Sequence, residues 1–229
     1  MAIAKGGIDI VRGGVQAGLA GYRRKKLAAI EEQGGNLAGA ARFGKQTQTT
    51  RIVGGVGTAL GGALAIGGGA ALLASNPIGW GLLGGAAVIG GGMAAYKRYR
   101  QHQLGKQMAN DPEYQEQLRR AGVHVPDSRD LAPKSGWEKF KNVITGKTEH
   151  VRRYHMVRAH LAESLARREK PGYEQDFNAE RIIKNLGIKK RPEEPRRGED
   201  EPLFDRAADE RREKAHRERV KNIARALEG

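Results

Sequence analysis

The chain has 229 residues, of which 38% are hydrophobic and 5% aromatic, and its formal net charge is +15. The absence of Cys excludes disulfides and thiolate chemistry, and the scarcity of large apolar residues argues against a large compact core. We therefore expect small helical units joined by linkers. No cleavable signal peptide is expected, because Asp9 and Arg12 interrupt the first apolar run.

Residues 1–51 are expected to form a basic, glycine-containing helical segment. They carry nine Lys or Arg against three Asp or Glu. A partial helical stripe is weakened by neighbouring glycines, and residues 33–36 (QGGN) predict a break. The apolar side chains of the stripe are Ile8, Ile10, Val11, Val15 and Leu19.

Residues 52–96 contain no charged residue, and 15 of the 33 glycines of the chain lie there. A turn is predicted at Asn76 and Pro77, with Gly79 close behind. It divides the segment into arms of about 34 Å and about 27 Å if both are helical, close to the thickness of a lipid core. This pattern predicts a helical hairpin.

Small residues recur every four positions on both arms of this hairpin, which allows close approach of two helix backbones. We interpret the pattern as a glycine zipper that enters a membrane, with a hairpin buried in a soluble protein or complex as the alternative. Positive residues flank it and would lie on the cytoplasmic side. The zipper positions are Gly57, Gly61, Ala65, Gly69, Ala87, Gly91 and Ala95, and the flank is Arg51, Lys97, Arg98 and Arg100.

The remainder is expected to be helical and basic. Residues 97–188 form one helical region, residues 189–203 a charged linker, and residues 204–229 a last charged helix. Asp111 followed by Pro112 predicts a capped helix that stops at Gly122. Two further helices are expected, at 149–169 and at 179–186, the second capped by Asn178.

No pattern in the sequence predicts an enzyme. His150, His155 and His160 are five residues apart, which does not match the spacing of metal ligands on a helix. The glycine-rich stretch lacks the preceding strand and the Lys of a phosphate-binding loop. We therefore expect no catalytic residue, no cofactor and no metal.

The stretch from Asn76 to Trp80 (NPIGW), the Gly/Ala-rich helix after it and the sequence YKRYR at 96–100 resemble the hydrophobic hairpin of bacterial secreted toxins. Proteins associated with contractile injection systems carry a similar hairpin. The resemblance implies a role in membrane insertion or delivery. The enzymatic modules and metalloprotease motifs of such proteins are absent from this sequence.

The sequence thus predicts an all-α protein that associates with or inserts into a membrane as a non-enzymatic bacterial effector or delivery-related protein. Anionic lipid is the expected partner, with helical self-association or a protein complex as further options. One alternative is a phage-like virion or injection-apparatus component that contacts nucleic acid or membrane on ejection. Another is a nucleic-acid-binding helical protein with a structural hairpin. The protein would be membrane-associated, or carried soluble in an injection particle and inserted on delivery.

Overall fold

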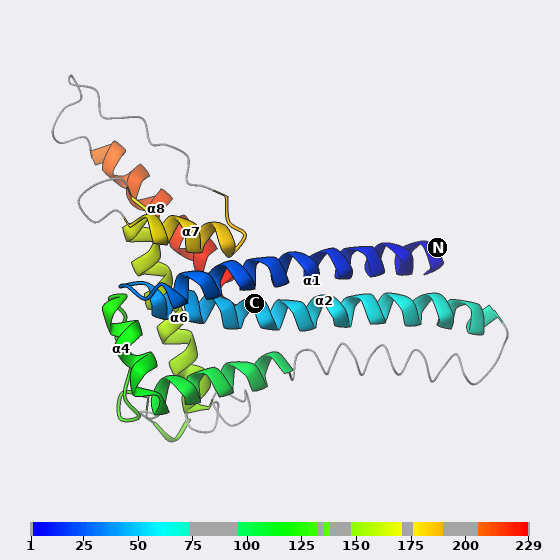
Figure 1. Cartoon of the computed structure of the whole chain (residues 1–229), viewed down its shortest axis with the longest axis horizontal. Helices are drawn as coiled ribbons and strands as arrows, with labels where there is room; N and C mark the ends of the chain where they lie inside the picture. Colours follow the sequence, from blue (N-terminus) through cyan, green and yellow to red (C-terminus); the bar gives the residue numbers. More distant parts are fainter. Residues whose placement is uncertain are drawn as a thin grey trace.

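The computed structural model describes residues 2–73, 96–131, 135–137, 148–170, 176–189 and 206–228. All regular secondary structure in these ranges is α-helical, which confirms the expected all-α class. Besides the helices that Figure 1 labels, residues 96–110 also form a helix. The labelled helices are α1 (Ala2–Glu32), α2 (Ala38–Leu73), α4 (Pro112–Arg120), α6 (Glu149–Arg168), α7 (Phe177–Asn185) and α8 (Arg206–Ala226).

Helices α1 and α2 lie side by side in opposite directions and form a long arm that projects from the other helices (Figure 1). The expected break at 33–36 is the turn between them. Gly34 and Gly35 adopt φ angles of 70° and 80°, a left-handed conformation that residues with a Cβ rarely adopt. The glycines that weaken the stripe do not interrupt α1, which is one continuous helix packed along its length against α2.

Helix α2 is continuous through residues 51 and 52, where the composition changes from basic to uncharged. Its first part is buried among the other helices, and the rest forms the arm with α1 (Figure 1). Side chains of α2 are described as far as Ala59. The predicted turn and the second arm of the predicted hairpin fall at 74–95, outside the described residues.

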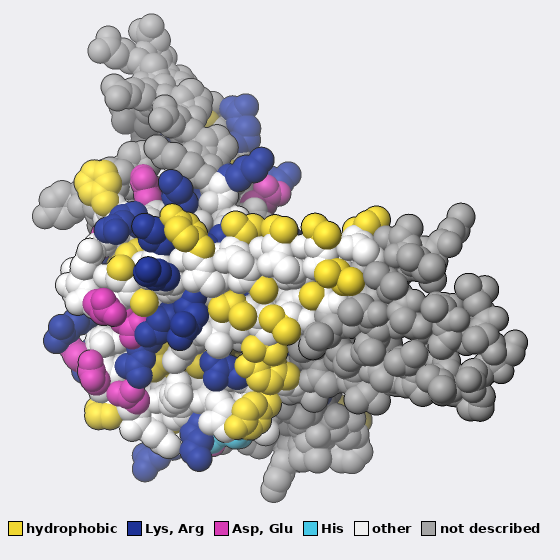
Figure 2. Space-filling model, turned by 45° about the vertical axis from the view of Figure 1, so that its right-hand side comes forward, with side chains coloured by type: hydrophobic (Ala, Val, Ile, Leu, Met, Phe, Trp, Pro, Cys, Tyr) yellow, Lys and Arg dark blue, Asp and Glu magenta, His cyan; other side chains and the backbone are white. Residues whose placement is uncertain are grey.

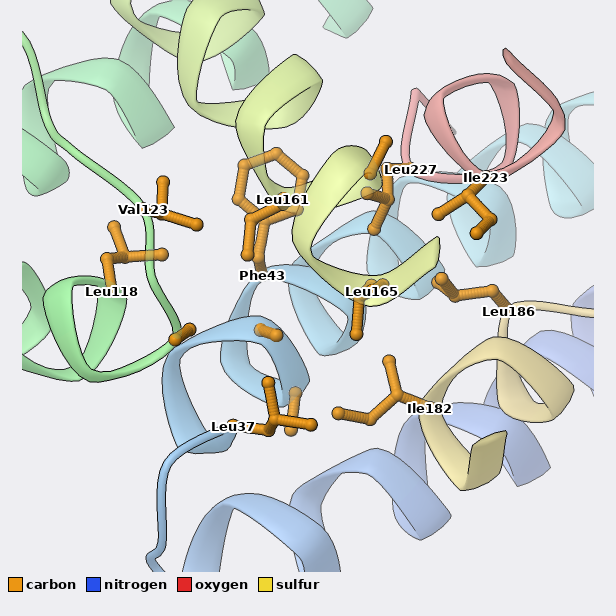
Figure 3. Packing of buried hydrophobic residues seen from close by; sticks show 14 of the residues in the cluster. Leu37, Phe43, Leu118, Val123, Leu161, Leu165, Ile182, Leu186, Ile223 and Leu227 are labelled. Carbon is orange, nitrogen blue, oxygen red and sulfur yellow. The ribbon is translucent and has the colours of Figure 1, made fainter. Parts of the chain in front are cut away.

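One cluster of buried hydrophobic side chains is built from helices that are far apart in the sequence. Phe43 of α2 stacks on Tyr154 of α6 with ring centroids 5.3 Å apart. Figure 3 shows side chains from α2, α4, α6, α7 and α8 converging on one another. The small helical units expected from the composition therefore share a core, because each helix contributes an apolar face to it.

Local signals place several helix ends correctly. Asp111 accepts a hydrogen bond from the backbone N–H of Tyr114 at 3.0 Å, and Gly122 ends α4 at φ 76°. Helix α6 forms within the expected range 149–169, and its apolar stripe of Val151, Tyr154, Val157, Leu161 and Leu165 is buried. The expected cap of α7 is wrong by two residues, because Asp176, not Asn178, accepts the capping hydrogen bond at 2.8 Å.

Buried charge connects α8 to α6. Arg219 of α8 donates two hydrogen bonds to the carboxylate of Glu169, at 2.7 and 2.5 Å. The side chains of the two residues are 11% and 3% exposed. His216 and Glu163 form a second link at 3.0 Å. Arg219 and His216 of the last helix are therefore held by carboxylates within or just after α6.

Candidate functional site

Glycines of α1 and α2 lie where the two helices come closest among the described side chains. A Cβ placed on Gly13 would lie 2.4 Å from the carbonyl oxygen of Gly55, and one on Gly55 would lie 2.8 Å from the amide nitrogen of Ala17. Gly13 with Ala17, and Gly55 with Ala59, are small residues four apart on facing helices. The contact is therefore a reciprocal small-residue crossing between α1 and α2.

Of the predicted zipper positions, Gly57 is half-buried in α2. Gly61, Ala65 and Gly69 follow it along the α2 backbone, without described side chains. The other predicted positions, Ala87, Gly91 and Ala95, and the turn at Asn76, Pro77 and Gly79 lie outside the described residues. The partner seen for the glycine-rich helix α2 is α1, which sequence reasoning treated as a separate segment.

The face of α1 that points away from α2 carries an exposed row of large apolar side chains. They are spaced three or four residues apart, and each is between 49% and 66% exposed. Figure 2 shows hydrophobic side chains lined along the arm. We call this set the apolar row, and it consists of Ile8, Val11, Val15, Leu19 and Tyr22.

A basic cluster, Arg23 to Lys26, follows the apolar row at the base of the arm. Lys25 and Lys26 are exposed, and the Lys26 ammonium lies 5.5 Å from the centroid of the Tyr22 ring. Arg24 donates a hydrogen bond to the Thr49 hydroxyl at 3.2 Å. Lysine and arginine side chains gather at this end of the arm in Figure 2. The arm thus has an apolar length and a basic base.

Arg51, which the sequence predicts as a membrane-flanking cation, is half-buried and hydrogen-bonded to other helices. Its guanidinium donates to the carbonyl of Leu186, just after α7, at 3.0 Å and to the carbonyl of Ala226 in α8 at 2.7 Å. Burial, and then the nearby charge of Arg23, lower the pKa of Arg51. Arg51 therefore satisfies unpaired carbonyls at two helix ends.

The other expected flank residues lie on the helix at 96–110. Lys97 forms an ion pair with Glu228 at 3.3 Å, Arg98 is exposed and Arg100 is half-buried. A hollow of about 600 Å³ opens between this helix and the base of the arm, with Arg23, Arg51 and Lys97 in its wall. Sequence reasoning missed this grouping, because its members are far apart in the chain.

The histidines and the uncharged segment raise the questions of a metal site and of a membrane-spanning helix. No group of three or more possible metal ligands is present among the described residues. His150 instead packs against His102, with ring centroids 4.8 Å apart, and burial lowers its pKa. Within the ranges that the structure describes, no helix is sufficiently long and apolar to cross a membrane.

Comparison of the chain with protein-family models, with curated proteins and with solved structures finds no match. Function is therefore inferred from the arm, its apolar row and its basic base.

Proposed function

We propose that this protein is a non-enzymatic, membrane-associating protein whose α1–α2 arm lies against an anionic lipid surface. The apolar row on α1 carries the proposal. Five large apolar side chains lie exposed on one helix face, although soluble proteins usually expose such residues singly. A lipid interface accommodates a helix of this kind, with its apolar face among the acyl chains.

The charges of the arm support an anionic lipid over an apolar protein groove. Between its start and the basic base, α1 carries three charged residues, Lys5, Asp9 and Arg12, and α2 is uncharged from residue 52 onward. Cations then follow at the base, where lipid phosphates would lie. Lys and Arg near an anionic membrane contribute about 1 kcal/mol each.

The two contributions are of similar size. Burial of the exposed parts of the apolar row is worth about 1 kcal/mol per side chain, or about 5 kcal/mol in all. This is close to the membrane affinity of a single myristoyl chain, which binds reversibly. The basic base adds a few kcal/mol at low salt. A reversible attachment of this strength fits a protein that is carried soluble and reaches a membrane on delivery, as in a bacterial effector.

The proposal includes the insertion of residues 52–96 into the membrane as a glycine-zipper hairpin. The distal part of α2 belongs to this uncharged segment and lies beside the N-terminal part of α1 (Figure 1). A lipid-bound arm would therefore bring the segment to the membrane. Nucleic-acid binding through α8 is less favoured, because Arg212, Arg217 and Arg219 all form ion pairs with carboxylates.

Vesicle flotation tests the proposal. The wild-type protein should float with vesicles that contain phosphatidylglycerol and should remain bound at about 0.5 M salt, where surface attraction is screened but burial is not. Val11→Ser combined with Val15→Ser should abolish flotation at that salt. Met156→Ser removes an exposed apolar side chain from α6 and is the matched control.

Equal flotation of the Val11/Val15 variant and the control would contradict the role of the apolar row. DNA binding that resists the same salt, with vesicles losing all protein, would favour the nucleic-acid alternative, since phosphate contacts to DNA weaken steeply with salt.

A further inference from the structure

The hollow at the base of the arm is bounded by three cationic side chains from three different segments. Arg23 comes from α1, Arg51 from α2 and Lys97 from the helix at 96–110. Gln16, Thr50 and Thr58 add polar groups to its wall. No carboxylate side chain of the described residues lines this hollow.

Arg23 retains its full capacity to donate. A guanidinium has five N–H donors, and no acceptor among the described residues takes a hydrogen bond from Arg23. The Arg23 side chain is nevertheless half-buried. Its guanidinium lies close to Gly187, since a Cβ built on that glycine would be 2.6 Å from Nη1 of Arg23. The guanidinium therefore lies against Gly187, while its hydrogen-bond donors remain available to an acceptor.

Arg51 has donors left as well. Two of its N–H groups reach the carbonyls of Leu186 and Ala226, which leaves three of the five for another acceptor. Those two bonds orient the guanidinium plane. A positioned guanidinium is suited to bidentate recognition of a phosphate or carboxylate.

The positive charge in the hollow is only partly neutralised. Glu228 is shared between Lys97, at 3.3 Å, and Arg158, at 3.0 Å. Neither Arg23 nor Arg51 forms an ion pair with a carboxylate of the described residues. The lowered pKa of Arg51 reflects burial and the proximity of Arg23, and an anion between the two guanidinium groups would relieve that repulsion.

We propose that this hollow is a binding site for a phosphate group, held between Arg23 and Arg51 with Lys97 at its edge. A phosphate fits because its oxygens accept several hydrogen bonds at once and its charge complements two guanidinium groups that form no ion pair with a carboxylate of the described residues. The site goes beyond membrane association and does not depend on it. The phosphate could belong to a lipid headgroup or to a free phosphate ion, and the experiment below separates these sources.

The site is tested on the full-length protein by phosphorus NMR and calorimetric titration with inorganic phosphate, at an ionic strength held constant with chloride. Wild type should bind with a saturable signal. Arg23→Gln should weaken binding at least tenfold, because it removes a guanidinium that makes no other hydrogen bond in the described structure. Lys25→Gln makes the same change of charge on the exposed side of α1 and should bind as wild type.

Equal phosphate binding by Arg23→Gln and Lys25→Gln, or the absence of saturable binding by wild type, would overturn the site. Circular dichroism of both variants establishes that they fold alike. Unfolding temperature with and without phosphate provides a second readout, because a ligand of the native state raises it in a concentration-dependent way.

Vesicles containing phosphatidic acid identify the source. If the site holds a lipid phosphate, Arg23→Gln should reduce vesicle binding more than Lys25→Gln, and soluble glycerol phosphate should compete in the wild type. If it holds free phosphate, the two variants should bind vesicles equally while only Arg23→Gln loses inorganic phosphate. Phosphate binding by a wild-type protein that does not float with vesicles would contradict the membrane proposal and leave this site intact.

Discussion

Adjacent glycines of α1 provide a matched test of the α1–α2 crossing. A Cβ at Gly13 would lie 2.4 Å from the carbonyl oxygen of Gly55 and 2.6 Å from the amide nitrogen of Ala59. A Cβ at Gly14 would meet nothing within 4 Å. Both residues are in the same turn of the same helix, so Gly13→Ala and Gly14→Ala differ in one respect, the distance to α2.

The two substitutions should change stability by different amounts. Ala is the better helix former by about 1 kcal/mol, so Gly14→Ala should stabilise the arm by about that amount. Gly13→Ala has the same local gain, but its Cβ needs about 1 Å of additional separation between the helices to reach ordinary contact. Overpacking of this kind costs about 1–3 kcal/mol. Gly13→Ala should therefore be less stable than Gly14→Ala by about 1–3 kcal/mol.

Urea denaturation followed by circular dichroism measures the difference, which corresponds to about 2–4 °C in unfolding temperature per kcal/mol for a chain of this size. Amide hydrogen exchange along α1 separates opening of the arm from global unfolding. If Gly13→Ala is as stable as Gly14→Ala and its α1 amides are equally protected, α1 does not cross α2 at this glycine pair.

The rest of the protein offers two further tests. Arg219→Leu should destabilise the protein by about 3–5 kcal/mol in urea denaturation, because it leaves the Glu169 carboxylate buried without its partner, and the double variant with Glu169→Leu should recover most of the loss. Stability should also fall as the pH drops below about 6.5, the ordinary pKa of histidine in an unfolded chain. Burial, followed by the charges of His102 and Arg153, lowers the folded-state pKa of His150, so the unfolded chain takes up a proton there first. His150→Gln should reduce this acid sensitivity in denaturation curves recorded between pH 7 and 5, and an unchanged pH profile would contradict the assignment.

The sequence by itself determined the helical class and many local features. Asp111, Pro112 and Gly122 mark the ends of α4, because capping hydrogen bonds and a left-handed glycine involve neighbours only a few residues away. The buried face of α6 could likewise be predicted from its 3.6-residue period. The two-residue error at α7 arose because Asp176 and Asn178 are both suitable caps, and the sequence contains no signal that ranks them.

The candidate site could be predicted only in part. The apolar stripe of α1 was visible, but its exposure was not, since a stripe of this kind usually faces a core. Arg51 was expected to mark a membrane boundary because it directly precedes the uncharged segment. Its observed acceptors, Leu186 and Ala226, are 135 and 175 residues further along the chain.

Tertiary structure alone decided which helix packs on α2. Small residues four apart occur on α1 as well as on α2, and sequence spacing shows that a helix can be approached closely without showing by which partner. The turn at Gly34 and Gly35 brings α1 back along α2, where Gly13 and Gly55 meet. The same crossing leaves the apolar row outside and places Arg23 opposite Arg51, because packing one face of α1 against α2 fixes the direction of every other side chain on that helix.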